Sequence, residues 1–397
     1  MSEQKIYNLA KKFEDKIIEI RHKIHRYPEL AFEEKRTAAL AAEIMKDLGF
    51  EVKKDIYHTG VSGLLGNTSK KEVKTILLRA DMDALPIEEK TGLPYSSEVP
   101  GVMHACGHDG HTAILLGTAM ILDELKNDFE GNVKFIFQPA EEAQGGAEGM
   151  IKEGVLKNPD VDAALGLHLW GNVPSGVVEY KKGPFMASPD KFEIIIKGRG
   201  GHAAQPHNCV DPVPIASSII EEFQKIVSRR TDPLESVVIS ICHLEGGTTY
   251  NVIPDNIMLE GTVRSLTPEI RESVPEIMRE VVEKITAMNN AEYNFDFEYR
   301  FSPLINDENM TELVKSSAQK IIGKKRVREA QKPNMGGEDF SYFAREVPAS
   351  FFYLGIAPSD KESINHHHPE FKVDDSVLKD GSAVMAQAVI DYFKEQN

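Results

Sequence analysis

Cysteine is scarce in this chain. Its 397 residues include only three cysteines, Cys106, Cys209 and Cys242. An odd and sparse set does not build the disulfide network that stabilises small secreted domains, so we expect a cytoplasmic protein in a reducing compartment. The first residues are not followed by an apolar segment like that of a signal peptide, which supports the same expectation.

Long apolar runs and an excess of basic residues are also missing. No run approaches the roughly 18 apolar residues that a membrane helix needs, so we expect no membrane partner. Lysine and arginine number 46 against 62 acidic residues, and the formal net charge is −16. Because nucleic-acid backbones attract basic surfaces, the sequence predicts no nucleic-acid partner. The length and the 41% of hydrophobic residues are those of a globular protein with two or three domains.

The spacing of apolar residues predicts an α/β fold. Short apolar runs at residues 75–80, 132–138 and 163–169 indicate buried strands. Helical spacing precedes them at residues 4–27, and a further helix is predicted near 112–125. Strands that alternate with helices favour a mostly parallel sheet with both faces covered.

The middle of the chain has a different pattern. Two predicted helices alternate with four predicted strands in the order β-α-β-β-α-β, which is the ferredoxin-like arrangement. The strands are expected at 191–197, 236–243, 257–263 and 293–301, and the helices at 212–227 and 267–287. Helix, strand and helix then return. We therefore predict a catalytic domain in two parts, 1–186 and 300–397, interrupted by an inserted α+β lid domain at 187–299.

Side chains that bind transition metals are concentrated in one short segment. His104, Cys106, His108 and His111 lie within eight residues, just before a predicted helix. Thiolate and imidazole are good ligands for zinc and related metals, and the Cys-x-His spacing lets two of them serve one centre from a loop. A single histidine would more simply cap the helix, but four such side chains together favour a metal site.

Acidic pairs follow two of the predicted strands. Glu141 and Glu142 come after the strand 132–138, and Asp81 and Asp83 end the strand 75–80. Sites in open α/β sheets form beyond the carboxyl ends of strands. One glutamate can bind metal while its neighbour takes a proton from water, and an aspartate can orient a ligating histidine. An acidic helix start and an Asp-rich turn are the alternatives.

Two further histidine positions fit the same chemistry. His168 ends the apolar run at 163–169, where a buried core histidine is the alternative. A run of three, His366, His367 and His368, precedes Pro369 near the C-terminus. The run is internal, so a purification tag does not account for it.

Taken together, these motifs resemble one family, the two-metal amidohydrolases. That family includes N-acyl-amino-acid amidohydrolases, hippurate hydrolases, N-acetyldiaminopimelate deacetylases and auxin-conjugate hydrolases, with carboxypeptidases among thermophilic relatives. The resemblance covers nearly the whole chain, from Ile24-His25-Arg26-Tyr27-Pro28-Glu29-Leu30 to His367-His368-Pro369. The motifs between these ends lie at 79–86, 104–112, 138–142, 200–206, 251–254 and 336–340.

The resemblance implies a site with two divalent metal ions per subunit, zinc, cobalt, nickel or manganese. Carried over motif by motif, the implied ligands are Cys106, His108, Glu142, His168 and His367. Glu141 matches the general base. Asp81 and Asp83 match the acidic pair, and the spacing to Pro86 favours Asp83. The spacing to Pro369 selects His367, with His366 and His368 as the alternatives.

In the inserted domain, the resemblance implies polar groups that bind substrate: His202, Asn251 and Arg264. His202 is expected to donate to the developing oxyanion, and Asn251 or Arg264 to hold the substrate carboxylate. A surface ion pair is the alternative for Arg264. We also expect a homo-oligomer formed through the lid domain.

The expected function is metal-dependent hydrolysis of the amide bond of N-acyl-L-amino acids (acetyl-, benzoyl- or similar), which releases a carboxylic acid and an amino acid. A metallo-carboxypeptidase or dipeptidase acting on short peptides on the same scaffold is one alternative. A non-catalytic metal-binding protein is the other. The pairing of Glu141 with Glu142 argues against it, because a storage site needs no second carboxylate to act as a base.

Overall fold

A computed structural model describes residues 3–66, 73–358 and 364–395 of the chain, which form two compact units. The first unit comprises Met1–Gly183, Ile305–Lys332 and Tyr342–Asn397. The second comprises Pro184–Leu304 and Pro333–Ser341. It therefore extends past the predicted insert at both ends. It also takes in residues 333–341, which the sequence analysis placed in the catalytic part.

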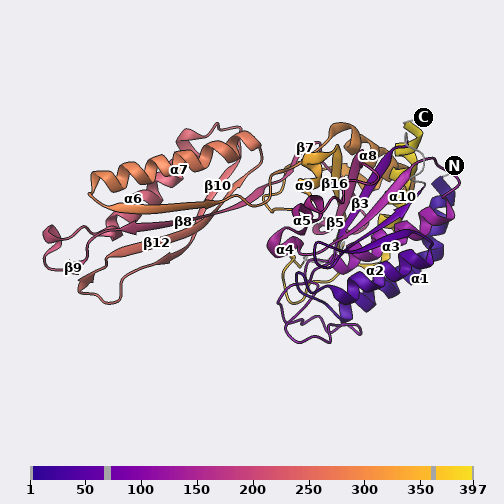
Figure 1. The fold of residues 1–397 in the computed structure, drawn as a ribbon, viewed down its shortest axis with the longest axis horizontal. Helices are drawn as coiled ribbons and strands as arrows, with labels where there is room; N and C mark the ends of the chain where they lie inside the picture. The colour runs from indigo at the N-terminus through magenta and orange to yellow at the C-terminus, as the bar shows by residue number, and fades with distance from the viewer. Residues whose placement is uncertain (1–2, 67–72, 359–363, 396–397) are drawn as a thin grey trace. The chain divides into compact units, whose positions relative to one another are not determined.

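The first unit is built on an eight-stranded sheet (Figure 1). Its strands, in spatial order, are β1 (Glu51–Ile56), β2 (Gly60–Leu65), β4 (Asn132–Gln138), β3 (Thr75–Asp81), β5 (Ala163–Pro174), β16 (Ala349–Ala357), β6 (Val178–Tyr180) and β15 (Val327–Glu329). The central strands β4, β3, β5 and β16 run parallel. All residues of β3 and β4 are buried, which explains why they appear as unbroken apolar runs. The prediction of an α/β fold with a mostly parallel sheet is confirmed.

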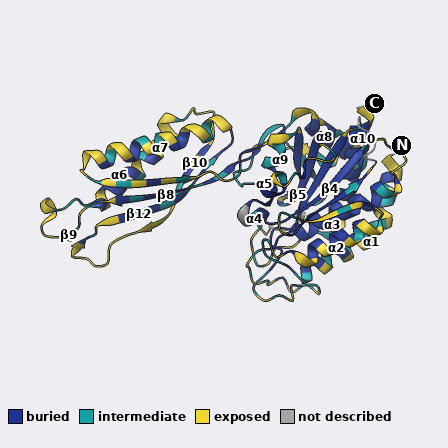
Figure 2. Ribbon diagram, viewed as in Figure 1, coloured by how far each residue is buried: buried dark blue, intermediate teal, exposed yellow. Residues whose placement is uncertain are grey.

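Helices cover this sheet. The longer ones are α1 (Glu3–Arg26), α2 (Lys35–Asp47), α3 (His108–Glu124), α8 (Glu308–Ile322) and α10 (Leu378–Glu395), and the shorter ones are α4 (Glu141–Gln144), α5 (Gly146–Lys152) and α9 (Ser341–Glu346). Helices α1, α3 and α10 pack against one another. Almost the whole of α3 is buried, whereas α1 keeps an exposed face, as the dark and light stretches of Figure 2 show.

The second unit has its own sheet and core. Its elements are β8 (Ser188–Lys197), β9 (Gly201–His202), α6 (Pro212–Lys225), β10 (Val237–Glu245), β11 (Val252–Ile253), β12 (Asn256–Ser265), α7 (Pro268–Met288) and β13 (Glu292–Glu298). The antiparallel sheet has the order β10-β12-β8-β13, which is the ferredoxin-like topology that the sequence predicted. Both helices lie on one face of it (Figure 1). Alternate residues of β8, such as Phe192, Ile194 and Ile196, are buried in the core of this unit.

The chain passes between the units in β7 (Gly183–Met186) and β14 (Leu304–Asn306), and again on either side of residues 333–341. This last segment is tied to the second unit by its backbone. The N–H of Ala187 lies 3.0 Å from both the carbonyl of Asn334 and that of Gly336. In the described ranges, no helix is both long and apolar enough to cross a membrane.

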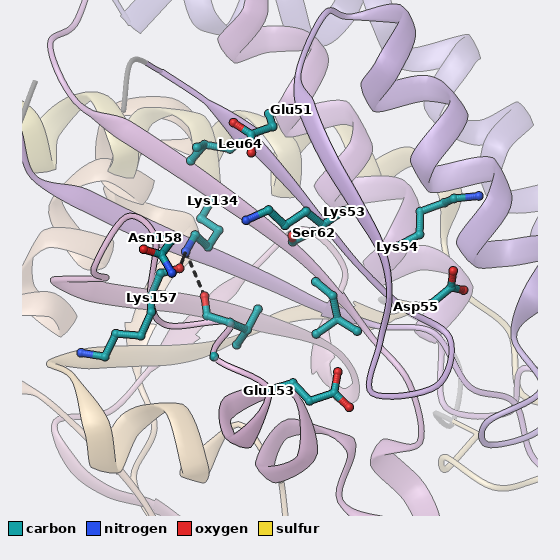
Figure 3. A pocket seen from close by; sticks show the side chains of 13 residues that line it. Glu51, Lys53, Lys54, Asp55, Ser62, Leu64, Lys134, Glu153, Lys157 and Asn158 are labelled. Atoms are coloured by element: carbon teal, nitrogen blue, oxygen red, sulfur yellow. Dashed lines mark hydrogen bonds between the residues drawn. The ribbon is translucent and has the colours of Figure 1, made fainter. Parts of the chain in front are cut away.

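A cavity of about 550 Å³ lies over β1, β2 and β4 in the first unit (Figure 3). It is lined by Lys53, Lys134 and Lys157 among others, and it contains none of the predicted site residues. The ammonium group of Lys134 is buried beside it and donates to the carbonyls of Val155 (2.9 Å), Lys157 (2.9 Å) and Pro159 (3.0 Å). One lysine side chain thus holds the loop that follows α5.

We expect Lys134→Met to lower the free energy of unfolding by about 1–3 kcal/mol, because buried carbonyls would lose their donors. Lys53→Met, at an exposed position of β1 that lines the same cavity, should change it by less than about 0.5 kcal/mol. Urea denaturation of both variants measures the difference. Equal midpoints for the two variants would contradict this role of Lys134.

Candidate active site

Four acidic residues gather at the carboxyl edge of the parallel strands. Asp81, the last residue of β3, is in register with Gln138, the last residue of β4. Asp83 and the pair Glu141 and Glu142 follow these two strand ends. Because parallel strands end at the same edge of a sheet, residues more than fifty positions apart become neighbours. His168 of the adjacent strand β5 joins them.

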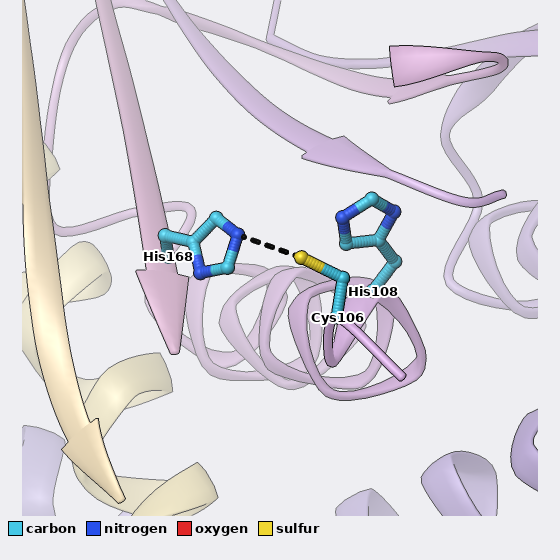
Figure 4. Close-up of side chains that lie close together, drawn as sticks. All are labelled: Cys106, His108 and His168. Carbon is cyan, nitrogen blue, oxygen red and sulfur yellow. Dashed lines mark hydrogen bonds between the residues drawn. The ribbon is translucent and has the colours of Figure 1, made fainter. Parts of the chain in front are cut away.

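Cys106, His108 and His168 converge on one point (Figure 4). The Cys106 Sγ atom lies 3.4 Å from His168 Nε2. His168 Nδ1 donates to the Leu169 carbonyl at 2.8 Å, which leaves the lone pair of Nε2 directed at the cluster and able to bind a metal. His108 Nε2 is buried and makes no hydrogen bond to any described residue. The ligand atoms of all three lie within 4.8 Å of one another.

A second group contains Cys106 with Glu142 and His367. His367 Nε2 lies 3.1 Å from Glu142 Oε1. The neighbours of His367 point elsewhere: His366 Nε2 donates to the Leu169 carbonyl at 2.9 Å, and His368 Nδ1 accepts the Glu370 N–H at 3.1 Å. Among the three histidines, His367 is the one whose ring reaches Glu142. The two groups share Cys106.

The two aspartates have different partners. The Asp83 carboxylate accepts from the backbone N–H groups of Glu141 (3.1 Å) and Glu142 (3.0 Å), and from His108 Nδ1 (3.2 Å). The Asp81 carboxylate is held instead by Arg79 Nη1 at 2.8 Å and by His111 Nδ1 at 2.6 Å. Asp83 therefore orients both His108 and the turn that carries the glutamates.

His111 is a supporting residue rather than a ligand. Its Nδ1 donates to Asp81, and its Nε2 accepts the Leu169 N–H at 2.8 Å, so both ring nitrogens are engaged. His111 belongs to the ligand-rich segment 104–111, but its sequence position does not predict this supporting role. Its partners lie thirty or more residues away, and one of them is a backbone group, so the local sequence carries no signal for it.

The electrostatics of the cluster favour a bound cation. Burial and the nearby carboxylates of Glu142 and Glu141 raise the pKa of the Cys106 thiol well above its usual value. Burial alone would lower the pKa of His108, but Asp81 and Asp83 raise it to about 10. Carboxylates thus lie close to both Cys106 and His108. A divalent ion would offset this charge and favour the thiolate.

The donor set also fits a metal chemically. It combines a thiol, imidazoles and a carboxylate, which together suit zinc and neighbouring divalent metals. Burial, with the nearby rings of His111 and His366, lowers the pKa of His168 well below its usual value, so its imidazole is neutral and able to ligate. The residues present therefore fit divalent metal ions.

A buried ionic network supports the start of α3. Asp109, next to His108, lies 2.9 Å from Arg21 Nε and 2.9 Å from His25 Nδ1. His25 Nε2 lies 3.3 Å from Glu89 Oε1. Burial opposes ionisation of Asp109, but Arg21 and His25 hold the pKa of its carboxyl well below the usual range. The sequence marked His25 as part of a motif, but it did not reveal this contact with Asp109.

Of the three residues predicted in the insert, His202 and Asn251 lie near each other and Arg264 lies apart. His202 is in β9 and pairs with Val252, next to Asn251, and both predicted residues are exposed. Arg264 is near the far end of β12, which begins at Asn256. Eight residues of strand at ~3.4 Å each place it roughly 27 Å along the strand from Asn256. In a single copy of the second unit, Arg264 is therefore remote from His202.

Residues 77–391 match the profile of peptidase family M20/M25/M40. The chain belongs to this family. It is 42% identical over 365 residues to N-acetyl-L-cysteine deacetylase of Bacillus subtilis, covering 92% of this chain and 85% of that protein. It is 40% identical over 394 residues to thermostable carboxypeptidase 1 of Saccharolobus solfataricus, covering 98% of both.

A solved structure described as a dinuclear metal binding peptidase, Bacillus subtilis YXEP, matches with a TM-score of 0.84 and 34% identity. The match covers 97% of this chain and 99% of that one. The resemblance inferred from the sequence motifs is thus confirmed. So is the enzyme class, a metal-dependent amidohydrolase.

Trp170, the single tryptophan of the chain, should report metal binding. Its ring lies edge-on to His168 with centroids 5.2 Å apart, and it stacks on Tyr353 at 4.3 Å. Because metal would immobilise His168, we expect adding zinc or cobalt to metal-free protein to change the Trp170 emission. A fluorescence titration measures this.

His168→Ala should remove most of that response at metal concentrations that saturate the original protein. The matched control, His207→Ala, changes an exposed histidine of the second unit and should keep the response. A full response in His168→Ala would contradict the assignment of His168 as a ligand.

Proposed function

We propose that this enzyme hydrolyses the amide bond of N-acyl-L-amino acids, releasing a carboxylic acid and an amino acid. The observation that carries the proposal is the turn of Glu141 and Glu142, whose backbone N–H groups are both fixed by the Asp83 carboxylate. Two adjacent carboxylates enter the ligand cluster from one rigid turn, so one is available as a ligand and the other as a base. The 42% sequence identity to an N-acetyl-L-cysteine deacetylase supports this substrate class.

Two divalent ions are proposed, with zinc, cobalt, nickel and manganese all compatible with the donors. Cys106 belongs to both ligand groups, one with His108 and His168 and one with Glu142 and His367. A shared thiolate suits a pair of neighbouring ions. When bound, the ions would polarise the substrate carbonyl and lower the pKa of water.

Glu141 is proposed as the proton carrier. It is buried, at 7% exposure, and it shares a ligand-type cluster with His108 and Glu142. Its carboxylate would take a proton from the attacking water and deliver it to the leaving nitrogen. Asp83 would keep it in place, because the Asp83 carboxylate holds the Glu141 N–H.

The second unit is proposed to bind substrate. His202 would donate to the oxygen that gains charge as the carbonyl is attacked, and Asn251 or Arg264 would hold the carboxylate of the amino acid. Because Arg264 lies far from His202 along β12, both would serve one small substrate only if two subunits contributed. We therefore keep the proposal of a homo-oligomer formed through this unit. The scarcity of cysteine supports a cytoplasmic location.

Peptide hydrolysis is the second candidate, because the chain is also 40% identical to a thermostable carboxypeptidase over almost its whole length. A substrate panel separates the two. Metal-loaded enzyme should release amino acids from acetyl-, benzoyl- or indoleacetyl-amino acids faster than from dipeptides and longer peptides. A preference for free-amino peptides would establish the peptidase, and no turnover of either class with metal bound would overturn both.

Glu141→Gln should keep its metal and lose roughly 10²–10⁴-fold in kcat, because only the proton carrier is removed. Glu142→Gln should lose metal, because a ligand is removed. Elemental analysis and initial rates on the same preparations measure both effects. Equal metal loss in the two variants would contradict the division of roles.

His202→Ala should leave metal content unchanged and lower kcat by roughly 10²–10³-fold, the usual cost of one oxyanion donor. His207→Ala, an exposed histidine five residues further on, is the control and should keep the full rate. Unchanged turnover in His202→Ala with metal bound would leave His202 as an ordinary surface histidine.

A further inference from the structure

Ala140, immediately before the two glutamates, has a left-handed backbone. Its φ is 55° and its ψ is 46°, and it is not a glycine. A residue with a Cβ adopts this conformation at an energetic cost, and such a conformation persists where the surrounding contacts enforce it. The turn therefore needs contacts that hold it. The Ala140 carbonyl accepts a hydrogen bond from Gly146 N–H at 3.2 Å.

The Ala140 N–H is bound by a carboxylate far away in the sequence. Glu34 Oε1 accepts it at 3.0 Å and also accepts the Phe32 N–H at 3.0 Å. Glu34 Oε2 accepts the hydroxyl of Thr59. Glu34 is completely buried, although it directly precedes helix α2 and makes no side-chain cap of that helix. Its carboxylate thus joins three separate segments of the first unit.

Consecutive backbone N–H groups of the turn are therefore held by two buried carboxylates. Glu34 takes that of Ala140, and Asp83 takes those of Glu141 and Glu142. We propose that Glu34 is a positioning residue, whose carboxylate keeps Ala140 left-handed and thereby directs Glu141 and Glu142 into the ligand cluster. The catalytic part of this inference rests on the proposed function, whereas its metal-binding part does not.

The charge state of Glu34 suggests a conservative replacement. Burial and the nearby Asp83 raise the pKa of Glu34 to about 7. The hydrogen bonds that Glu34 accepts favour its ionised form, but they offset this rise only in part. A neutral group with the same shape can still accept from Phe32 and Ala140 through one oxygen. Glutamine has that shape, and its amide can donate to the Thr59 hydroxyl.

The test compares Glu34→Ala with Glu29→Ala. Glu29 accepts the N–H groups of Arg36 and Thr37 and the Thr37 hydroxyl, so it supports the start of the same helix without touching Ala140. Each substitution removes a carboxylate that accepts hydrogen bonds from three donors. Only Glu34→Ala removes a contact to the turn at Ala140. Each is measured for zinc affinity by Trp170 emission and, at saturating zinc, for kcat and KM.

We expect Glu34→Ala to bind zinc about 10–100-fold more weakly, because a ligand-bearing turn is released. At saturating zinc, kcat should fall on the order of 10²-fold, as for a misplaced catalytic group, with KM changed less than about threefold because Glu34 does not touch substrate. Glu29→Ala should be less stable but keep the zinc affinity and kcat of the original protein. Glu34→Gln should recover most of what Glu34→Ala loses.

A second substitution tests the mechanism directly. Glycine adopts left-handed backbone without a Cβ penalty. Ala140→Gly in the Glu34→Ala background should therefore recover about tenfold in kcat and in zinc affinity, whereas it should give no gain in the Glu29→Ala background. If Glu34→Ala does not fold, Glu34→Asp replaces it. Its shorter carboxylate keeps the charge but withdraws from Ala140, so the same losses are expected.

Zinc affinity and kcat in Glu34→Ala equal to those of Glu29→Ala would overturn the inference, and so would the absence of any gain from Ala140→Gly. Failure of the proposed function has a different signature. The original protein with zinc bound would then hydrolyse no substrate of the panel, while the zinc affinities would still rank Glu34→Ala below Glu29→Ala.

Discussion

The site depends on one buried carboxylate, that of Asp83. It is 1% exposed, and a buried carboxylate is tolerated only where hydrogen-bond donors replace its water. Those donors are the ring of His108 and the backbone of Glu141 and Glu142. The need to satisfy Asp83 therefore fixes the start of α3 relative to the start of α4. The proposed ligands His108 and Glu142, from two separate helices, are thereby held in one arrangement.

The backbone of Leu169 has a comparable function on the other side of the cluster. Its N–H is accepted by His111, and its carbonyl accepts from His168 and His366. The backbone of this one residue thus sets the orientation of three imidazole rings. This backbone is the strand β5, which is paired with β16 and β3, so the rings inherit the rigidity of the sheet.

Much of the fold and part of the site could be predicted from the sequence. The strands β3 and β4 are buried on both faces, and β8 alternates between core and surface, so each leaves its own period in the sequence. Residues at the ends of parallel strands could be grouped for the same reason. The grouping of Asp81, Glu142 and His168 needed only the rule that such ends share an edge.

What could not be predicted depends on backbone groups and on distant pairs. Glu34 and Ala140 are 106 residues apart, and no pattern in the sequence links the two positions. The three consecutive histidines differ through local backbone, with a φ of 64° at His367. The return of residues 333–341 to the second unit rests on main-chain hydrogen bonds to Ala187. None of these features produces a side-chain pattern.

The position of the insert has a consequence for how the chain folds. Strands β5 and β16 pair in parallel although the whole segment 184–304 lies between them, and pairing across so long a loop is slow and leaves a strand edge open to aggregation during synthesis. The insert reduces this difficulty. Its first and last strands, β8 and β13, are neighbours, with Lys191 opposite Glu298. Once the insert has folded, the two ends of the loop are already close. Pairing β5 with β16 then costs only the loop-closure entropy of a much shorter chain.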